Sequence, residues 1–140
     1  MSEEQNKATV RRFVEEYKNK ANHDIVLELF TPGFVTHLHL PGIPPNREGF
    51  RMLGKGVVSA FPDVHATIED LLADGEKVIE RTSATATSKG AFNGIPPTGK
   101  PVRWTEIHIY RFERGKIAEH WGEIDFFGLM AQLGAIPPPR

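Results

Sequence analysis

The apolar residues at the start of the chain recur with the spacing of an amphipathic helix. They lie at i, i+3, i+4 and i+7 and are Val10, Phe13, Val14 and Tyr17. This spacing predicts a helix from about Glu3 to Ala21. Ser2 and Gln5 match a capping box at its start, and Asn22 is the expected C-cap.

Two further helices and a short strand are predicted in the first half of the chain. Asp24–Leu29 has the pattern of a short helix that begins at Asp24 and is broken by Thr31-Pro32-Gly33. Phe34–Leu40 is expected to be a strand, and the PGIPPN segment after it a loop. Asn46 is placed to cap the next helix, which Pro62 ends. The apolar face of that helix consists of Phe50, Leu53, Val57 and Phe61.

From Pro62 onward, apolar and polar residues alternate with the period of two that is typical of strands. The strands predicted from this alternation are Asp63–Ala73, Val78–Ser88, Pro101–Phe112 and Lys116–Asp125. Asp74-Gly75 and Glu113–Lys116 are turn sequences that link neighbouring strands into hairpins. A short apolar segment, FFGLMAQLG, closes the domain, and the IPPPR tail is expected to be loose.

Helices followed by an antiparallel meander are the pattern of the α+β fold class. The 140 residues fit one domain over positions 1–140. Lysine and arginine number 17 against 18 acidic residues, so nothing in the net charge favours a nucleic acid or a membrane as partner. The absence of cysteine excludes disulfides and thiolate chemistry and fits a cytoplasmic protein.

One segment, Lys89–Pro101, joins two long strands but is too long for a tight hairpin. It is rich in glycine and proline. Because long ordered loops often cover binding sites, this segment is either a lid or a plain surface connection.

The third predicted strand carries titratable side chains on the face that should be buried. That face is mostly large and aromatic and consists of Val102, Trp104, Glu106, His108, Tyr110 and Phe112. A buried carboxylate and imidazole must be paired or hydrated, because an isolated buried charge is costly. His120 of the last strand lies across a tight turn from His108, so both can face one cavity. Since a neutral imidazole can take or return a proton near pH 7, Glu106, His108 and His120 are candidate acid/base residues.

These residues also have structural interpretations, since a single Glu or His in a strand is most often solvated or paired. Trp104 and Trp121 are better core residues than ligand platforms. His37 and His39 alternate in phase, and they either line a pocket mouth or lie on the outer surface. The chain has 6 histidines, but no HxxxH or HExxH pattern predicts a metal site.

The stretch GIPPTGKPVRWTEIHIYRFERGKIAEHWGEID, followed by LMAQLG, resembles the SnoaL-like polyketide cyclase family, whose members are often called ester cyclases. GIPPTGK, GKIAEHW and QLG are the most specific pieces, and the similarity is strongest from about Phe61 to Gly134. The first third of the chain agrees in layout, including F-x-x-H after the second helix and REGF at the start of the third.

The resemblance implies the NTF2-like cone, in which N-terminal helices pack on a strongly curved antiparallel sheet and enclose an apolar pocket. It also implies a homodimer or larger homo-oligomer formed through the outer face of the sheet. Characterised members close rings by intramolecular aldol condensation, with an acidic side chain as general acid/base and without a metal or a cofactor. An apolar pocket would raise the pKa of such a carboxylate toward neutrality.

One position departs from the family pattern. The catalytic Asp of the family lies two residues after the histidine of the last strand, and this chain has Gly122 there. The two histidines of the pattern match as His108 and His120. The acid/base carboxylate would then be Glu106, in phase with His108, or Glu123, turned inward by a bulge at Gly122.

The expected function is therefore cofactor-independent acid/base chemistry next to a carbonyl group, as an aldol-type cyclisation, an isomerisation or a lyase reaction. The expected ligand is a small, apolar, carbonyl-containing molecule. A binding protein without chemistry and a hydrolase that activates water in the pocket are the alternatives. The residues expected to contact the ligand are Trp104, Tyr110, Phe92, His37, His39, Trp121 and Asp125. Asp125 has a second interpretation, as the cap of the closing segment.

Overall fold

A computed structural model describes residues 2–137 of the chain. Its elements follow in the order α1 (Glu3–Phe13), the π-helix η1 (Val14–Asn19), α2 (Ile25–Leu29), β1 (Phe30–Thr36), α3 (Arg47–Ala60), β2 (His65–Asp74), β3 (Lys77–Thr87), β4 (Pro101–Glu113), β5 (Lys116–Ile124) and α4 (Phe126–Gln132). The expected order of helices first and a strand meander afterwards is confirmed, and with it the α+β fold class.

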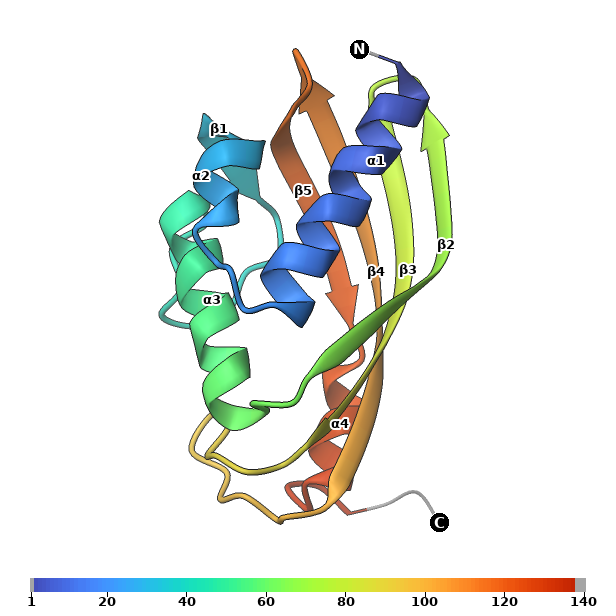
Figure 1. The fold of residues 1–140 in the computed structure, drawn as a ribbon. Helices are drawn as coiled ribbons and strands as arrows, with labels where there is room; N and C mark the ends of the chain where they lie inside the picture. The colour runs from blue at the N-terminus through green and yellow to red at the C-terminus, as the bar shows by residue number, and fades with distance from the viewer. Residues whose placement is uncertain (1, 138–140) are drawn as a thin grey trace.

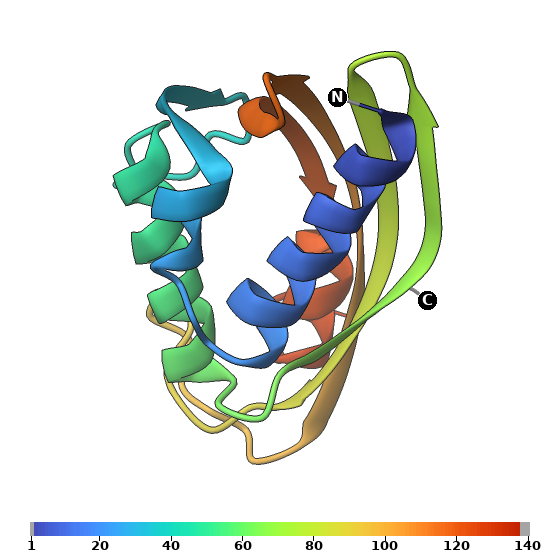
Figure 2. The same ribbon diagram turned by 45° about the horizontal axis from the view of Figure 1, so that its top comes forward.

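The strands form one five-stranded sheet of order β1-β5-β4-β3-β2. Strands β2 to β5 pair antiparallel, while β1 pairs parallel with β5 at the edge. The long strands bend along their length, and α1, α2 and α3 all lie on the hollow side of the sheet (Figure 1). The second view shows the same helices facing the curved sheet, with α4 at one end of it (Figure 2). This arrangement leaves the inward faces of β3, β4 and β5 opposite the helices.

Two groups of buried side chains hold the helices to the sheet. The first is rich in aromatic rings, and its centre is formed by Phe13, Phe30 and Phe50, whose rings lie within 6.3 Å of one another. The second gathers Phe61 and Trp104 with α4. Since full burial of a Phe side chain contributes roughly 1.5–3 kcal/mol, these two groups dominate the stability of the fold.

Several sequence predictions about the sheet are confirmed. The inward face of β4 alternates as predicted, with even-numbered residues buried from Val102 to Phe112. Both predicted hairpin turns are present. In the second of them Arg114 and Gly115 have φ values of 51° and 80°, the left-handed pair that a tight two-residue hairpin requires.

The first strand was predicted at the wrong place. It spans Phe30–Thr36 rather than Phe34–Leu40, so Thr31-Pro32-Gly33, expected to be a break, lies inside it. Pro32 is tolerated because β1 is an edge strand whose pairing with β5 is irregular between Phe30 and Val35. The three residues Pro138–Arg140 of the IPPPR tail lie outside the described residues.

The first helix also differs from the prediction. Its α-helical part is confirmed from Glu3, with the Ser2–Gln5 capping box, but it ends at Phe13 and continues as the π-helix η1 to Asn19. The C-cap is Lys20, not Asn22. A π-helix closes i→i+5 hydrogen bonds, so the residue five positions after Phe13, which is Lys18, is brought to the same inward side.

Asn19 fixes this wider turn to the sheet. Its side-chain amide donates to the Ala66 carbonyl at 3.1 Å and its side-chain oxygen accepts from the Ala66 N–H at 2.7 Å. The pair of bonds joins the end of η1 to β2 across 47 residues of sequence. Lys18, the residue before Asn19 in η1, is thereby held in place opposite the sheet.

We predict that Asn19→Ala destabilises the protein by about 1–3 kcal/mol, because it leaves two backbone groups of Ala66 without their partners. Urea denaturation measures the change. Asn22→Ala is the matched control, since the side chain of Asn22 makes only one hydrogen bond, which is exposed and joins it to Glu16 at 3.4 Å. Equal stability of the two variants would contradict the proposed tie between η1 and β2.

Candidate functional site

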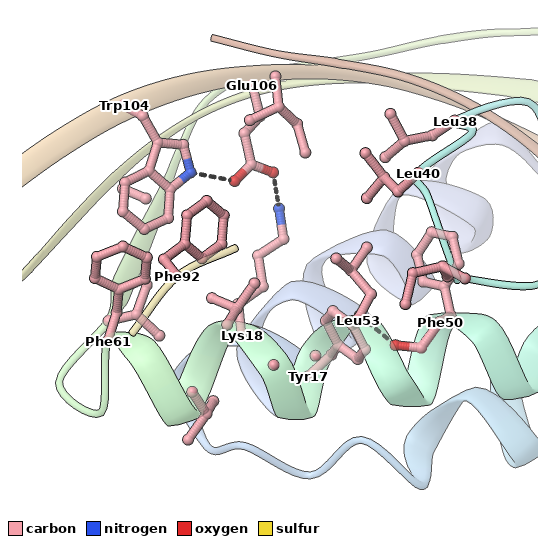
Figure 3. Close-up of a pocket in the computed structure, with 18 of the residues that line it drawn as sticks. Tyr17, Lys18, Leu38, Leu40, Phe50, Leu53, Phe61, Phe92, Trp104 and Glu106 are labelled. Atoms are coloured by element: carbon pink, nitrogen blue, oxygen red, sulfur yellow. Dashed lines mark hydrogen bonds and ion pairs between the residues drawn. The ribbon is translucent and has the colours of Figure 1, made fainter. Parts of the chain in front are cut away.

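A cavity of about 750 Å³ lies between the helices and the sheet. Its wall is mostly apolar and includes Leu40, Phe50, Leu53, Phe61 and Phe92 (Figure 3). Strand β4 supplies the opposite wall with inward-facing side chains that include Trp104, Glu106, His108 and Tyr110. The volume is that of a site for a small organic molecule.

Part of the Lys89–Pro101 segment lines this cavity. The N–H groups of Lys89 and Gly90 both donate to the Ala60 carbonyl at 3.0 Å, which fastens the segment to the end of α3. Phe92 then packs its ring 5.4 Å from that of Phe61 and lines the cavity. The segment therefore contributes directly to the cavity wall.

The polar part of the cavity wall is centred on Glu106. Its Oε1 accepts from Lys18 Nζ at 2.6 Å and lies 2.7 Å from His108 Nε2, and its Oε2 accepts from Trp104 Nε1 at 2.7 Å. Figure 3 shows the Trp104 and Lys18 bonds converging on the carboxylate from two sides of the cavity. Glu106 is buried, so these donors replace the water that its charge would otherwise need.

Behind Glu106 the hydrogen bonds continue through two imidazoles. His108 Nδ1 lies 2.8 Å from His120 Nε2, and the two rings stack with centroids 5.0 Å apart. His120 Nδ1 lies 2.7 Å from the Thr36 hydroxyl, which also accepts from the Leu38 N–H at 3.0 Å. His120 is fully buried and does not line the cavity, so it acts on the cavity only through His108.

The partners of this chain fix its hydrogen atoms. An ionised Glu106 only accepts, so His108 carries its proton on Nε2 and its Nδ1 must accept from His120 Nε2–H. His120 Nδ1 then accepts from the Thr36 hydroxyl. With both imidazoles neutral, every ring nitrogen has a partner and all the bonds run in one direction, toward Glu106.

A second buried carboxylate stands beside the first. Glu80 of β3 lies 3.6 Å from Lys18 Nζ, accepts from the Tyr110 hydroxyl at 2.6 Å and also accepts from the Thr82 hydroxyl. It is fully buried and lies outside the cavity lining. Lys18 therefore bridges two carboxylates, one on the cavity wall and one behind it.

The charges of this cluster are stabilised by one another. Burial opposes the charge of Glu106, but Lys18 and His108 outweigh it and hold the pKa of Glu106 well below its usual range. Burial likewise opposes the charge of Lys18, and Glu106 and Glu80 reverse this and raise the pKa of Lys18. Burial lowers the pKa of His120 well below 6.5, and the nearby positive charge of Lys18 adds to the effect. The expectation that the apolar pocket raises the carboxylate pKa is therefore wrong for Glu106.

Several candidates predicted from the sequence come together at this site. They are Glu106, His108, Trp104, Tyr110 and Phe92, which line the cavity, and His120, which lies behind His108. Trp104 is both a core residue and a hydrogen-bond donor to Glu106, so its two interpretations are not exclusive.

The other candidates lie elsewhere. The pairing of β5 with β4 is regular at Gly122, so β5 has no bulge there and Glu123 is exposed on the outer face of the sheet. The expectation that Glu123 turns inward was therefore wrong. The register shift between the two strands lies further along, between Arg111 and Phe112 of β4. Asp125 caps α4 by accepting from the Gly128 N–H at 2.9 Å, which confirms its structural interpretation.

Three further candidates, His37, His39 and Trp121, are also absent from the cavity wall. His37 stacks on Trp121 with ring centroids 5.1 Å apart, and its Nε2 lies 2.6 Å from a carboxylate oxygen of Glu119. His37 and His39 are exposed, so the interpretation that places them on the outer surface holds.

Sequence reasoning missed Lys18, Glu80 and Thr36. Lys18 lies eight residues after Val10, at the edge of the apolar stripe, but a charged residue there gave no sign of burial; in the structure it lies in the π-helix and lines the cavity. Glu80 did carry a signal, since it alternates in phase with the buried residues Val78 and Thr82 on β3. Thr36 was placed in the predicted first strand but without a partner for its hydroxyl.

Gly122 lies directly against the histidine pair. A Cβ at this position would come within 2.8 Å of His108 Nδ1 and 2.8 Å of His120 Cε1. Any side chain here therefore requires the two rings to separate. The direct hydrogen bond between His108 and His120 depends on glycine at the position where the family pattern has its Asp.

Within residues 2–137, no group of three or more histidines and carboxylates is arranged to hold a metal ion. In the same residues, no helix combines the length and the apolar character needed to cross a membrane.

Comparison with known proteins places these features in context. The sequence profile of the SnoaL-like polyketide cyclase family matches residues 8–133. Aklanonic acid methyl ester cyclase DnrD from Streptomyces peucetius is 28% identical over 130 residues, which make up 89% of this chain and 88% of DnrD.

Solved structures show the same similarity. AclR from Streptomyces galilaeus superposes with a TM-score of 0.88 at 28% identity, over 99% of this chain and 87% of AclR. IdmH from Streptomyces antibioticus superposes with a TM-score of 0.80 at 33% identity, over 93% of this chain and 99% of IdmH. These similarities confirm the expected NTF2-like α+β fold.

We predict that Gly122→Ala destabilises the protein by about 1–3 kcal/mol, because the new methyl group must separate the His108 and His120 rings. Urea denaturation gives the stability, and imidazole NMR signals report the loss of the bond between the rings. Gly33→Ala is the control, since a Cβ at this strand glycine meets nothing within 4 Å. Unchanged imidazole signals in Gly122→Ala would refute the assigned contact.

A second prediction concerns acid. The pKa of Glu106 is lower in the folded protein than the value of 4.5 expected in the unfolded chain, so the unfolded state binds more protons between these two values. The stability contributed by ionised Glu106 is complete above 4.5 and is lost as the pH falls through the range below it.

The free energy of unfolding of the wild type should therefore fall more steeply below about pH 4.5 than that of Glu106→Gln, which cannot titrate at this position. Urea denaturation at a series of pH values measures both slopes. Glu123→Gln, altered at an exposed carboxylate, should follow the wild type. Parallel curves for Glu106→Gln and wild type would show that Glu106 is not stabilised as an anion.

Proposed function

This chain belongs to the SnoaL-like polyketide cyclase family, and from that premise we propose that it moves a proton next to a carbonyl group of a small apolar ligand. The family supports a cofactor-independent function of the cyclase or isomerase type in general. The specific proposal is that Glu106 is the acid/base residue and that His108 orients it.

The observation that carries the proposal is a charged carboxylate in the wall of an apolar cavity of about 750 Å³. Burying Glu106 and Lys18 costs free energy, and a hydrophobic wall of equal size would often be as stable or more so. A protein that only binds an apolar ligand needs no buried ion pair in its cavity wall. Charged groups that face an apolar cavity are typical of sites that perform chemistry.

The free lone pairs indicate which atom reacts. Glu106 Oε1 accepts from both Lys18 and His108. Oε2 accepts only from Trp104, so it has a free lone pair that can take a proton from a ligand. In the proposed step a C–H bond next to the ligand's carbonyl breaks, its proton passes to Oε2 and its electron pair moves onto the carbonyl oxygen, forming an enolate.

Two outcomes follow from this enolate. Return of the proton from Oε2 to a different carbon gives an isomer. Attack of the enolate carbon on a second carbonyl of the same molecule forms a carbon–carbon bond, and the proton on Oε2 then goes to the new alkoxide, which completes an aldol-type cyclisation. Both outcomes restore Glu106 to its ionised form and need no further reactant.

The low pKa of Glu106 sets the kind of C–H bond it can break. A weakly basic carboxylate matches an acidic proton better than an ordinary ketone proton. The ligand expected from this match has the reacting carbon between two carbonyl groups, where the enolate charge is spread over two oxygens.

Two alternatives make different demands on the site. A binding protein without chemistry is favoured by the fact that the ring nitrogens of His108 and His120 are already occupied. A hydrolase would need a carboxylate network around water, yet Glu106 is the one carboxylate among the described residues that line the cavity.

The outer face of the sheet supports the expected homo-oligomer. Ile107 of β4 and Leu72 of β2 point away from the cavity and are 49% and 60% exposed. Apolar side chains in the open on a sheet face are typical of surfaces that a second copy covers.

The test is catalysed exchange of the acidic C–H proton of ethyl benzoylacetate in deuterated buffer, followed by NMR. The wild type should exchange the proton faster than buffer alone, and Glu106→Gln should lower the catalysed rate by roughly 10²–10⁴-fold, the usual contribution of general acid–base catalysis. Glu123→Gln should keep the wild-type rate, because its carboxylate lies on the outer face. Saturable binding of the ester without faster exchange would favour the binding protein.

A further inference from the structure

Lys18 is the cavity residue whose chemistry the proposed acid/base step leaves unused. It comes from the π-helix η1, on the helix side of the cavity opposite β4 (Figure 3). Its side chain is only 14% exposed, and no other lysine or arginine in the described part of the chain lines the cavity.

The ammonium group has more donors than the protein satisfies. One of its three N–H groups donates to Glu106 Oε1 at 2.6 Å. The Glu80 oxygen at 3.6 Å attracts the charge but is too distant for a direct hydrogen bond. At least one N–H of this cavity-lining residue therefore has no acceptor among the described residues, and a buried donor of this kind favours a ligand oxygen.

Glu80 accounts for the position of the ammonium. The Tyr110 and Thr82 hydroxyls hold its carboxylate in place on β3, and the carboxylate pulls Lys18 from behind. Without Glu80, the short bond to Glu106 would be the one strong restraint on Nζ. Two carboxylates on different strands instead keep the ammonium at the edge of the cavity, where it can serve both Glu106 and a ligand.

We propose that Lys18 is a catalytic residue that donates a hydrogen bond to the ligand oxygen on which negative charge develops, and that Glu80 is its positioning residue. The inference rests on the proposed function in assigning the reaction, but the binding of an oxygen anion can be measured without any reaction. A preorganised donor aimed at a developing oxyanion is among the strongest devices that an enzyme has.

The charge of the cluster then selects the ligand class. Lys18 contributes one positive charge and Glu80 and Glu106 contribute two negative charges, so the cluster carries a net charge of −1 when the imidazoles are neutral. A ligand that arrives as an anion adds to this excess. A neutral ligand can instead give its own proton to Glu106 while its oxygen becomes negative, and the total charge of ligand and cluster then stays the same. Neutral enolisable or phenolic molecules are therefore favoured over carboxylates.

The test uses 4-nitrophenol, whose oxygen can carry negative charge, and 4-nitroanisole, in which a methyl group prevents it. The wild type should bind 4-nitrophenol more tightly than 4-nitroanisole, and the bound phenol should ionise at a pH lower by about one unit or more than in a variant without the Lys18 ammonium. The absorbance of the phenolate during a pH titration reports this shift.

Lys18→Met alone leaves two buried carboxylates uncompensated and can unfold the protein. The informative variant is Lys18→Met with Glu80→Gln, which removes one buried charge of each sign. Loss of phenolate binding in a variant that still binds 4-nitroanisole then reflects the missing ammonium of Lys18. Lys20→Met is the control for a distant charge, since Lys20 is 59% exposed in its side chain.

The assignment of Lys18 is overturned if the wild type binds 4-nitrophenol and 4-nitroanisole with equal affinity. It is also overturned if the double variant still binds 4-nitroanisole and keeps the wild-type preference for 4-nitrophenol. A lost preference in the double variant and a retained one in Lys20→Met support it. If the wild type shows the phenolate preference but does not exchange ester protons, the oxyanion site stands and the proposed acid/base step fails. The two proposals can therefore fail separately.

Discussion

The ionised carboxylate of Glu106 is the group on which the rest of the site depends. A buried charge without partners would be neutralised or would unfold the protein, so its presence in the cavity wall demands several strong donors at once. Trp104, Lys18 and His108 meet that demand from three directions at 2.6–2.7 Å. The rest of the cavity wall is mostly apolar, so the charged and polar groups of the site are gathered around Glu106.

The donors come from different parts of the fold, which explains why the scaffold has its irregular features. Trp104 and His108 flank Glu106 at every second residue of β4, so strand alternation alone brings them together. Lys18 lies in the π-helical turn after Phe13, and Asn19 fastens that turn to β2. The turn and its attachment to the sheet therefore help to set the position of the one cationic side chain that lines the cavity among the described residues.

The fold and the part of the site that lies on β4 and β5 could be predicted from the sequence because both depend on local patterns. Period-two alternation in β4 placed Glu106 and His108 on the buried face, and the turn at Arg114-Gly115 made β5 the neighbour of β4. These are local signals. Lys18 was missed because a charged residue at the edge of an apolar stripe gives no sign of its partners. The role of Thr36 was missed because its hydroxyl meets His120, which lies 84 residues away in the chain. The low pKa of Glu106 depends on a lysine 88 residues away in the chain, which no periodicity reveals.

The direction of the hydrogen bonds gives the site a property that no single residue has. From the Leu38 N–H through Thr36, His120 and His108, each donor points toward Glu106. A proton added to His108 would make its Nδ1 a donor, so His120 would have to accept at Nε2 and move its own proton to the side of Thr36. The tautomers of the two rings are therefore coupled through their shared hydrogen bond. Gly122 is part of this coupling, because a side chain there would place atoms where the two rings now meet. Glycine at position 122 is thus the feature that permits direct contact between the two histidines.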